Sequence, residues 1–112
     1  MYGNVQIGDK TVEMLSNAAS PVFFRQVFHE DFLAKTVEMN SSGAIDTDTF
    51  SKMFFIIVKQ AEIADLMKLN FNSYIEWISQ FELVDLINVL PDIATFVFGQ
   101  MQGSAVPKNE GE

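Results

Sequence analysis

DTDTFSKMFFIIVKQA, residues 46–61, contains the longest helical pattern of the chain. Its apolar side chains recur at intervals of three and four residues, the spacing that places them on one face of an α-helix. This stripe consists of Phe50, Met53, Phe54, Ile57, Val58 and Ala61. Phe55 and Ile56 lie off the stripe, so the helix is apolar on more than one side. Such a helix is either central to the fold or in contact with a second protein.

The residues before this helix predict a β-hairpin and two short helices. In residues 4–15 apolar and polar side chains alternate on both sides of Gly8-Asp9, a pair that permits the positive φ of a tight turn. Two strands alone are marginally stable, so the hairpin must pack on the remaining chain. A helix follows, with Ser20 as its cap and Pro21 in its first turn. A second helical piece begins at Phe32, and the polar residues 39–48 predict a loop.

The residues after 61 predict further amphipathic helices. Residues 70–73 resemble a linker and helix cap, and Pro91 suits the first turn of a new helix that Gly99 ends. Two stripes precede Pro91: Tyr74, Trp77, Ile78 and Phe81 form the first, and Leu83, Leu86, Ile87 and Leu90 form the second. The predicted fold is mainly α, with a small N-terminal β-hairpin packed on a bundle of about five short-to-medium helices (α+β). We expect one domain over residues 1–101 and a disordered polar tail over 102–112.

Composition excludes several classes of function. The 112-residue chain has a net charge of −8 and no basic residue between Lys68 and Lys108, which argues against binding to nucleic acid. The absence of cysteine excludes disulfides and thiolate metal sites. The longest apolar run, residues 53–58, is far shorter than the roughly 20 residues of a membrane span. We therefore expect a cytoplasmic protein with no membrane partner. Its 11 phenylalanines fit either an aromatic-rich core or a surface for self-association or a partner.

The sequence contains no arrangement of residues that predicts catalysis. His29-Glu30-Asp31 is the only cluster of histidine with carboxylates, and adjacent residues point in different directions. Asp46 and Asp48 open like a calcium loop, but the glycine and glutamate that such a loop needs at its sixth and twelfth positions are absent. Acidic residues at a helix N-terminus favour the helix dipole, so capping is the better interpretation. We predict no enzyme activity, no cofactor and no metal.

Several segments carry a resemblance to a known family. They are Ala19-Ser20-Pro21 before an aromatic helix, VKQAE at 58–62, WISQFE at 77–82, VDL at 84–86 and LPDI at 90–93. Their order and spacing, over residues 4–98, resemble the tail assembly chaperones of long-tailed bacteriophages and prophages of Gram-positive bacteria. The resemblance also implies a glycine-like break in the first helix, where His29 stands in this chain.

The resemblance implies a non-catalytic function in the cytoplasm of a bacterial host. Such chaperones bind the long helical tape measure protein, keep it soluble and help to recruit tail tube subunits. Many have two lengths, and this chain would be the short form. The major tail tube protein would then be contacted through a frameshifted long form, which the polar tail would join. A homo-oligomer is a further possible assembly.

Residues off the helical stripes are the candidate partner contacts. An apolar stripe that meets an amphipathic partner helix is a common mode of recognition. We predict contact through Phe55 and Ile56, and through Phe98, which lies beyond the last stripe. Other functions stay open: a self-assembling structural or adaptor protein of the connector kind, without a chaperone role, or a small enzyme or metal protein that uses His29. A nucleic-acid regulator is disfavoured by the net charge of −8.

Overall fold

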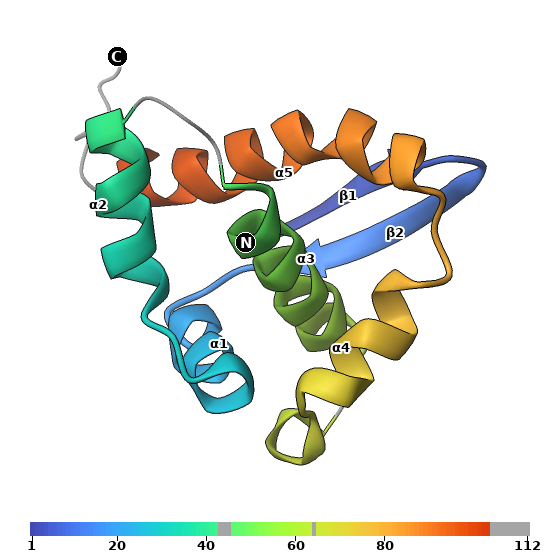
Figure 1. Ribbon diagram of the computed structural model, residues 1–112, viewed down its shortest axis with the longest axis horizontal. Coiled ribbons are helices and arrows are strands. Elements are labelled where there is room, and N and C mark those ends of the chain that lie inside the picture. Colours follow the sequence, from blue (N-terminus) through green and yellow to red (C-terminus); the bar gives the residue numbers. More distant parts are fainter. Residues whose placement is uncertain (43–45, 64, 104–112) are drawn as a thin grey trace.

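The computed structural model describes residues 1–42, 46–63 and 65–103. A two-stranded antiparallel sheet precedes five α-helices and one short 3-10 turn in these residues. The elements are β1 (Tyr2–Ile7), β2 (Lys10–Leu15), α1 (Ser20–Phe28), α2 (Phe32–Ser42), α3 (Thr47–Ala61), η1 (Leu66–Lys68), α4 (Phe71–Ile78) and α5 (Leu83–Gly103). The predicted class, a mainly α fold with an N-terminal hairpin, is confirmed. Helix α3 crosses the middle of the molecule, and α5 runs across the top of the view in Figure 1.

The hairpin forms as the alternating pattern predicts. Val5 pairs with Val12 across the two strands, and Gly8 adopts φ +61° in the turn. The strands pack on the helices, with β2 against α3 and β1 against α5. The contact with α5 is close, since a Cβ added to Gly3 would lie 2.6 Å from the ring of Phe96. The helices therefore supply the apolar surface that two strands need for stability.

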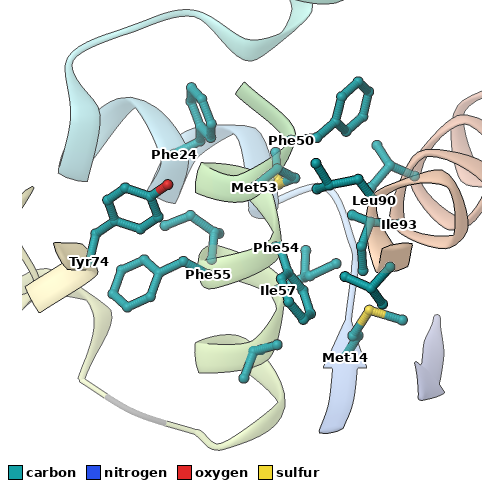
Figure 2. Close-up of a cluster of buried hydrophobic side chains, with 14 of the residues drawn as sticks. Met14, Phe24, Phe50, Met53, Phe54, Phe55, Ile57, Tyr74, Leu90 and Ile93 are labelled. Atoms are coloured by element: carbon teal, nitrogen blue, oxygen red, sulfur yellow. The ribbon is translucent and has the colours of Figure 1, made fainter. Parts of the chain in front are cut away.

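Helix α3 is the centre of the hydrophobic core. Eleven of its fifteen residues are buried, and side chains from α1, α4, α5 and β2 surround it. Figure 2 shows Phe24 and Tyr74 on one side of α3, and Met14, Leu90 and Ile93 on the other. Of the two interpretations of a helix with apolar residues on several sides, the central position is therefore the correct one.

The prediction that Phe55 and Ile56 lie at the surface is wrong. Both side chains are 0 % exposed. The ring centroid of Phe55 lies 5.6 Å from that of Tyr74 and 5.5 Å from that of Trp77, so α4 covers this side of α3. Aromatic pairs at these separations are favourable beyond the area that they bury. These two residues belong to the core and cannot contact a partner in the folded protein.

The start of α1 differs from the expectation, and the start of α3 agrees with it. Ser20 is the first residue of α1 rather than its cap, and its hydroxyl donates a 2.6 Å hydrogen bond to Oε1 of Gln60. Asn17 joins the same network by accepting a 3.1 Å hydrogen bond from Nε2 of Gln60, so the start of α1 is tied to the end of α3. Asp46 caps α3 by accepting from the backbone N–H of Asp48, which agrees with the capping interpretation.

Helix α1 ends in a left-handed residue, at the position where the resemblance implies a glycine-like break. His29 adopts φ +59° and ψ +32°, and its backbone N–H donates a 2.8 Å hydrogen bond to the carbonyl of Arg25. This conformation costs an L-amino acid roughly 1–2 kcal/mol because Cβ crowds the following carbonyl oxygen. Glycine avoids the penalty, which is why it is common at this position of a helix end.

We expect His29→Gly to stabilise the fold by about 0.5–1 kcal/mol, since relief of the strain at Cβ exceeds the extra chain entropy that glycine loses on folding. The free energy of unfolding in urea measures the change. His29→Ala is the matched control and should give no gain, because alanine keeps a Cβ. A glycine variant that is less stable than the native protein would show that the imidazole makes contacts that outweigh the strain.

The boundaries of the other helices differ from the predictions in two places. Helix α2 continues to Ser42, so the predicted loop over 39–48 begins too early, because serine and asparagine do not by themselves stop a helix. The predicted helix break at Pro91 is wrong. Helix α5 is continuous through Pro91 and Gly99, reaches Gly103 and is longer than α3.

The continuity of α5 places its buried face differently from the second predicted stripe. Leu90 is buried as expected, but Leu83 and Ile87 are exposed. Over residues 83–99, the part of α5 whose side chains are described, the buried ones are Val89, Leu90, Ile93, Ala94 and Val97. Residues 104–112, which hold most of the predicted disordered tail, lie outside the described residues. Within the described part of the chain, no helix is both long and apolar enough to cross a membrane.

Candidate functional site

Helix α5 is apolar on two sides, and only one of them faces the core. The second side carries three large exposed side chains: Leu83 is 71 % exposed, Val84 61 % and Ile87 52 %. Pro91, also exposed, follows one turn after Ile87. Residues three and four apart share a helix face, so these four residues form one surface, which we call the outer stripe. The exposed fractions of Leu83, Val84 and Ile87 show that no other described element covers them.

The fold itself explains why these residues stay exposed. Strand β1 and helix α3 both pack against α5, and they occupy the opposite side, where Val89 and Ile93 are buried. The core of a small domain can cover one face of a helix, so a second apolar face is left in water. Scattered apolar residues on a surface need no explanation, but a contiguous row marks an interaction site.

Acidic residues of α5 lie on a different side of the helix from the outer stripe, since none of them stands three or four residues from a member of the stripe. Asp85 and Asp92 lie seven residues apart, which places them along the same edge of α5, and Glu82 precedes the helix. Among the described residues, none of these three carboxylates forms an ion pair. The nearest basic residue along the chain is Lys68, and the hairpin contributes Lys10 close to the start of the helix. The ammonium of Lys10 donates a 3.1 Å hydrogen bond to Oε1 of Gln80.

Phe98 is the one predicted contact residue that reaches the surface. It is half-buried, and its ring centroid lies 5.3 Å from that of Phe50. Phe98 follows Pro91 by seven residues, so it continues the outer stripe toward the C-terminal end of α5. Phe98 therefore packs against the edge of the core, whereas Phe55 and Ile56 lie inside it.

Two other surfaces also expose apolar side chains. A groove of about 550 Å³ between α1 and α2 includes Val22 and Leu33, which are 63 % and 50 % exposed. Its remaining lining residues are Pro21, Arg25, Gln26, His29 and Asp31, so its charge is mixed. On α4, Phe71 and Ile75 are exposed to 52 % and 42 %. Each of these surfaces exposes two large apolar side chains, fewer than the three of the outer stripe.

His29 lines the groove between α1 and α2 together with Asp31, and its backbone ends α1. Within the described residues there is no group of three histidine, aspartate or glutamate side chains placed to hold a metal ion. The side chain of Glu30 contacts α3 instead, because it accepts a 3.2 Å hydrogen bond from the ammonium of Lys52.

Lys52 is a buried cation that the sequence pattern did not indicate. Its ammonium lies 2.9 Å from Oδ2 of Asp48 and 3.2 Å from Oε1 of Glu30, and 5.4 Å from the ring centroid of Phe28. Burial alone would lower the pKa of Lys52, but hydrogen bonds and charges from Asp48 and Glu30 outweigh it and raise the pKa. Burial is also the main reason that the pKa of Tyr74 is raised.

We expect the protein to lose stability in alkali through these two groups. A pKa that is raised by folding adds stability that is present below the unfolded value and lost as the pH rises through the folded value. The unfolded values are 10.5 for Lys52 and 10.0 for Tyr74, so the loss begins at about pH 10. Urea unfolding between about pH 8 and pH 11 measures it.

The double variant Lys52→Met/Tyr74→Phe should show a shallower decline over this range of pH. Lys68→Met is the matched control, because Lys68 forms only an exposed 3.7 Å ion pair with Asp65. It should decline as the native protein does. An equally steep decline in the double variant would mean that other groups cause the alkaline loss.

Comparisons with protein-family models, curated proteins and solved structures found no match to this chain. The functional interpretation therefore depends on the residues of this chain and on the surfaces that its fold exposes.

Proposed function

We propose that this chain is the short form of a bacteriophage tail assembly chaperone, which binds and solubilises the tape measure protein in the cytoplasm of the bacterial host. The observation that supports this best is the outer stripe of α5, a row of exposed apolar residues on a chain with a net charge of −8. The resemblance of residues 4–98 to this family supplies the identity of the partner.

The physical demands of the proposed function fit this surface. A long amphipathic helix that has not yet been assembled exposes an apolar face to water, and this face drives aggregation. A chaperone must cover that face with an apolar surface of its own and give the complex enough charge to stay in solution. The outer stripe would supply the apolar surface, and the net charge of −8 would keep the complex in solution.

Recruitment of tail tube subunits is the second part of the proposed function. We assign contact with the major tail tube protein to a frameshifted long form, in which an extension would follow α5. The proposed action is non-catalytic and requires no cofactor. It uses association and release only, so weak contacts repeated along a long partner helix suit it better than one tight site.

Co-expression with the tape measure protein encoded beside this chain tests the proposal. We expect a soluble complex with many copies of this chain for each partner, measured by size-exclusion chromatography with light scattering. The tape measure protein expressed alone should be insoluble. A partner that stays insoluble, while this chain elutes by itself as a closed oligomer, would contradict the chaperone function and favour a self-assembling structural or adaptor protein.

A further inference from the structure

We propose that the outer edge of strand β1, the edge that faces away from β2, is a docking site for an extended segment of a partner protein. The segment would pair with β1 as a third strand and carry lysine or arginine on the side that faces α5. This site differs from the outer stripe. The inference goes beyond the proposed function, because it depends neither on the tape measure protein nor on a helical partner.

The backbone groups along the outer edge of β1 have no hydrogen-bond partner among the described residues. Met1 and Ser16 exchange two hydrogen bonds, of 2.6 and 2.9 Å, so they form a hydrogen-bonded pair of the ladder. Hydrogen-bonded and non-hydrogen-bonded pairs alternate along antiparallel strands. The register therefore places Tyr2, Asn4 and Gln6 in non-hydrogen-bonded pairs, and their N–H and C=O groups point away from β2. All three residues are exposed.

Strand β1 also lacks the features by which proteins protect an edge strand. Its sequence, YGNVQI, contains no charged residue and no proline, and its register with β2 is continuous from Tyr2 to Ile7 without a bulge. Charged side chains, proline and bulges are the usual means of preventing an edge from pairing with another chain. Strand β2 differs, because it carries Lys10 and Glu13. The edge of β1 is therefore the one open to strand addition, a common mode of peptide recognition.

Helix α5 lies along β1 on the core face of the sheet. A Cβ added to Gly3 would lie 2.6 Å from the ring of Phe96, and one added to Gly8 would lie 2.8 Å from Oδ2 of Asp85. Five residues of a strand and eleven of a helix both span about 16 Å, so β1 and α5 run side by side in opposite directions (Figure 1). Asp92 lies four residues before Phe96 and seven after Asp85, so it shares this side of α5, which we call the acidic side.

The acidic side of α5 determines the side chains of the partner. The core side of α5, around Ile93, faces α3, so the acidic side lies toward the open edge of β1. Neither Asp85 nor Asp92 forms an ion pair with a described residue. Every second side chain of an added strand projects to the face on which α5 lies. Complementary charge selects partners, so lysine or arginine at these positions is favoured and glutamate is rejected.

A second copy of β1 fits this edge less well than a partner strand. Two antiparallel strands that pair through a two-fold axis present the same face of the joined sheet. Both copies of α5 would then lie on one face with their acidic sides toward each other, and residues 69–103 contain no lysine or arginine to compensate. Adjacent strands are about 4.8 Å apart, whereas packed helices need about 8–10 Å between their axes, so the two helices would also compete for space.

Two designed peptides test the inference on the full-length protein. Both are extended chains of about seven valine-rich and threonine-rich residues, with lysine at every second position in one and glutamate in the other. We expect the lysine peptide to bind at least about tenfold more tightly in fluorescence anisotropy, and rising salt to reduce the difference.

Amide hydrogen exchange, measured by NMR, locates the peptide on the protein. The lysine peptide should slow exchange at Tyr2, Asn4 and Gln6, whose N–H groups point outward. It should leave Val5 unchanged, because the N–H of Val5 already pairs with β2. Equal affinity for the two peptides, or no slowing at these three amides, would overturn the inference.

Three variants test the paired edge and the acidic side separately. Gln6→Pro removes one outward N–H from β1 and should weaken the lysine peptide about tenfold, since proline cannot donate to a new strand. Thr11→Pro, directly opposite on β2, removes an N–H from the other edge and should bind as the native protein does. Asp92→Lys keeps the backbone of β1 intact and should make the glutamate peptide the tighter ligand. Unchanged binding in Gln6→Pro with native circular dichroism, or an unchanged preference in Asp92→Lys, would overturn the inference.

The protein without peptide distinguishes a partner strand from a second copy. Exchange at Asn4 and Gln6 should be fast and independent of protein concentration. Exchange that becomes slower as the concentration rises would assign the edge to a second copy and overturn the inference.

Discussion

Replacing Phe55 and Ile56 together with serine should unfold the protein. Both side chains are fully buried, and α4 packs its aromatic rings against Phe55. Truncating a buried phenylalanine costs about 3–5 kcal/mol and an isoleucine about 2–5 kcal/mol, and two buried hydroxyls add to the loss. The sum is comparable to the whole stability of a typical domain, about 5–15 kcal/mol. Circular dichroism in increasing urea measures the loss of the cooperative transition.

The matched control for this prediction is the double variant Leu83→Ser/Val84→Ser. It removes two large apolar side chains that are 71 % and 61 % exposed, so its cost should stay within about 1 kcal/mol. A variant at positions 55 and 56 that unfolds at the same urea concentration as the native protein would contradict the central position of α3. Such a result would mean that Phe55 and Ile56 lie at the surface.

Pro91→Ala should stabilise the protein by about 1–3 kcal/mol. A proline inside a helix has no N–H to donate, and its ring crowds the carbonyl four residues earlier, which belongs to Ile87 here. Alanine removes both defects and is the residue most favourable in a helix. Pro91 is exposed, so little packing is lost with its ring.

The urea midpoint of Pro91→Ala measures this gain. Thr95→Ala, at an exposed position one turn later in the same helix, is the control and should change stability by less than about 1 kcal/mol. A loss of stability in Pro91→Ala would show that the packing of α5 on β1 and α3 requires a bend that proline provides.

Local pattern was sufficient for much of the fold. The turn at Gly8, the apolar period of α3 and the cap of α4 each depend on residues close in sequence. Asn70 illustrates the last of these, because its side chain accepts a hydrogen bond from the backbone N–H of Ser73, in the segment expected to cap a helix. These features are governed by backbone conformation and by nearest neighbours, so the sequence of one chain is enough to predict them.

The burial of Phe55 and Ile56 could not be predicted in the same way. The spacing of apolar residues shows that a helix has a second apolar side, but it does not show which element covers that side. Here the cover comes from Tyr74 and Trp77 of α4, which lie about twenty residues further along the chain. The position of α4 depends on packing of the whole domain, and no local signal in the sequence specifies it.

The outer stripe was missed because α5 was divided at Pro91. With the helix divided, Leu83 and Ile87 were placed on one stripe with Leu90. In the continuous helix, the buried face is centred on Val89 and Ile93, and Ile87 turns outward. A wheel drawn over all of residues 83–103 would have revealed one apolar arc that is wider than the face buried in the core. Proline by itself favours the first turn of a new helix at residue 91. The packing of α5 along β1 and α3 outweighs this preference and keeps the helix continuous.

Site-specific photo-crosslinking tests the central claim most directly. A photoreactive amino acid replaces Ile87 in cells that co-express this chain with the tape measure protein encoded beside it, and replaces Val22 in a parallel sample. The expected result is a crosslink to the tape measure protein from position 87 and little from position 22. No crosslink from position 87, or equal crosslinking from both positions in a soluble complex, would contradict binding through the outer stripe of α5.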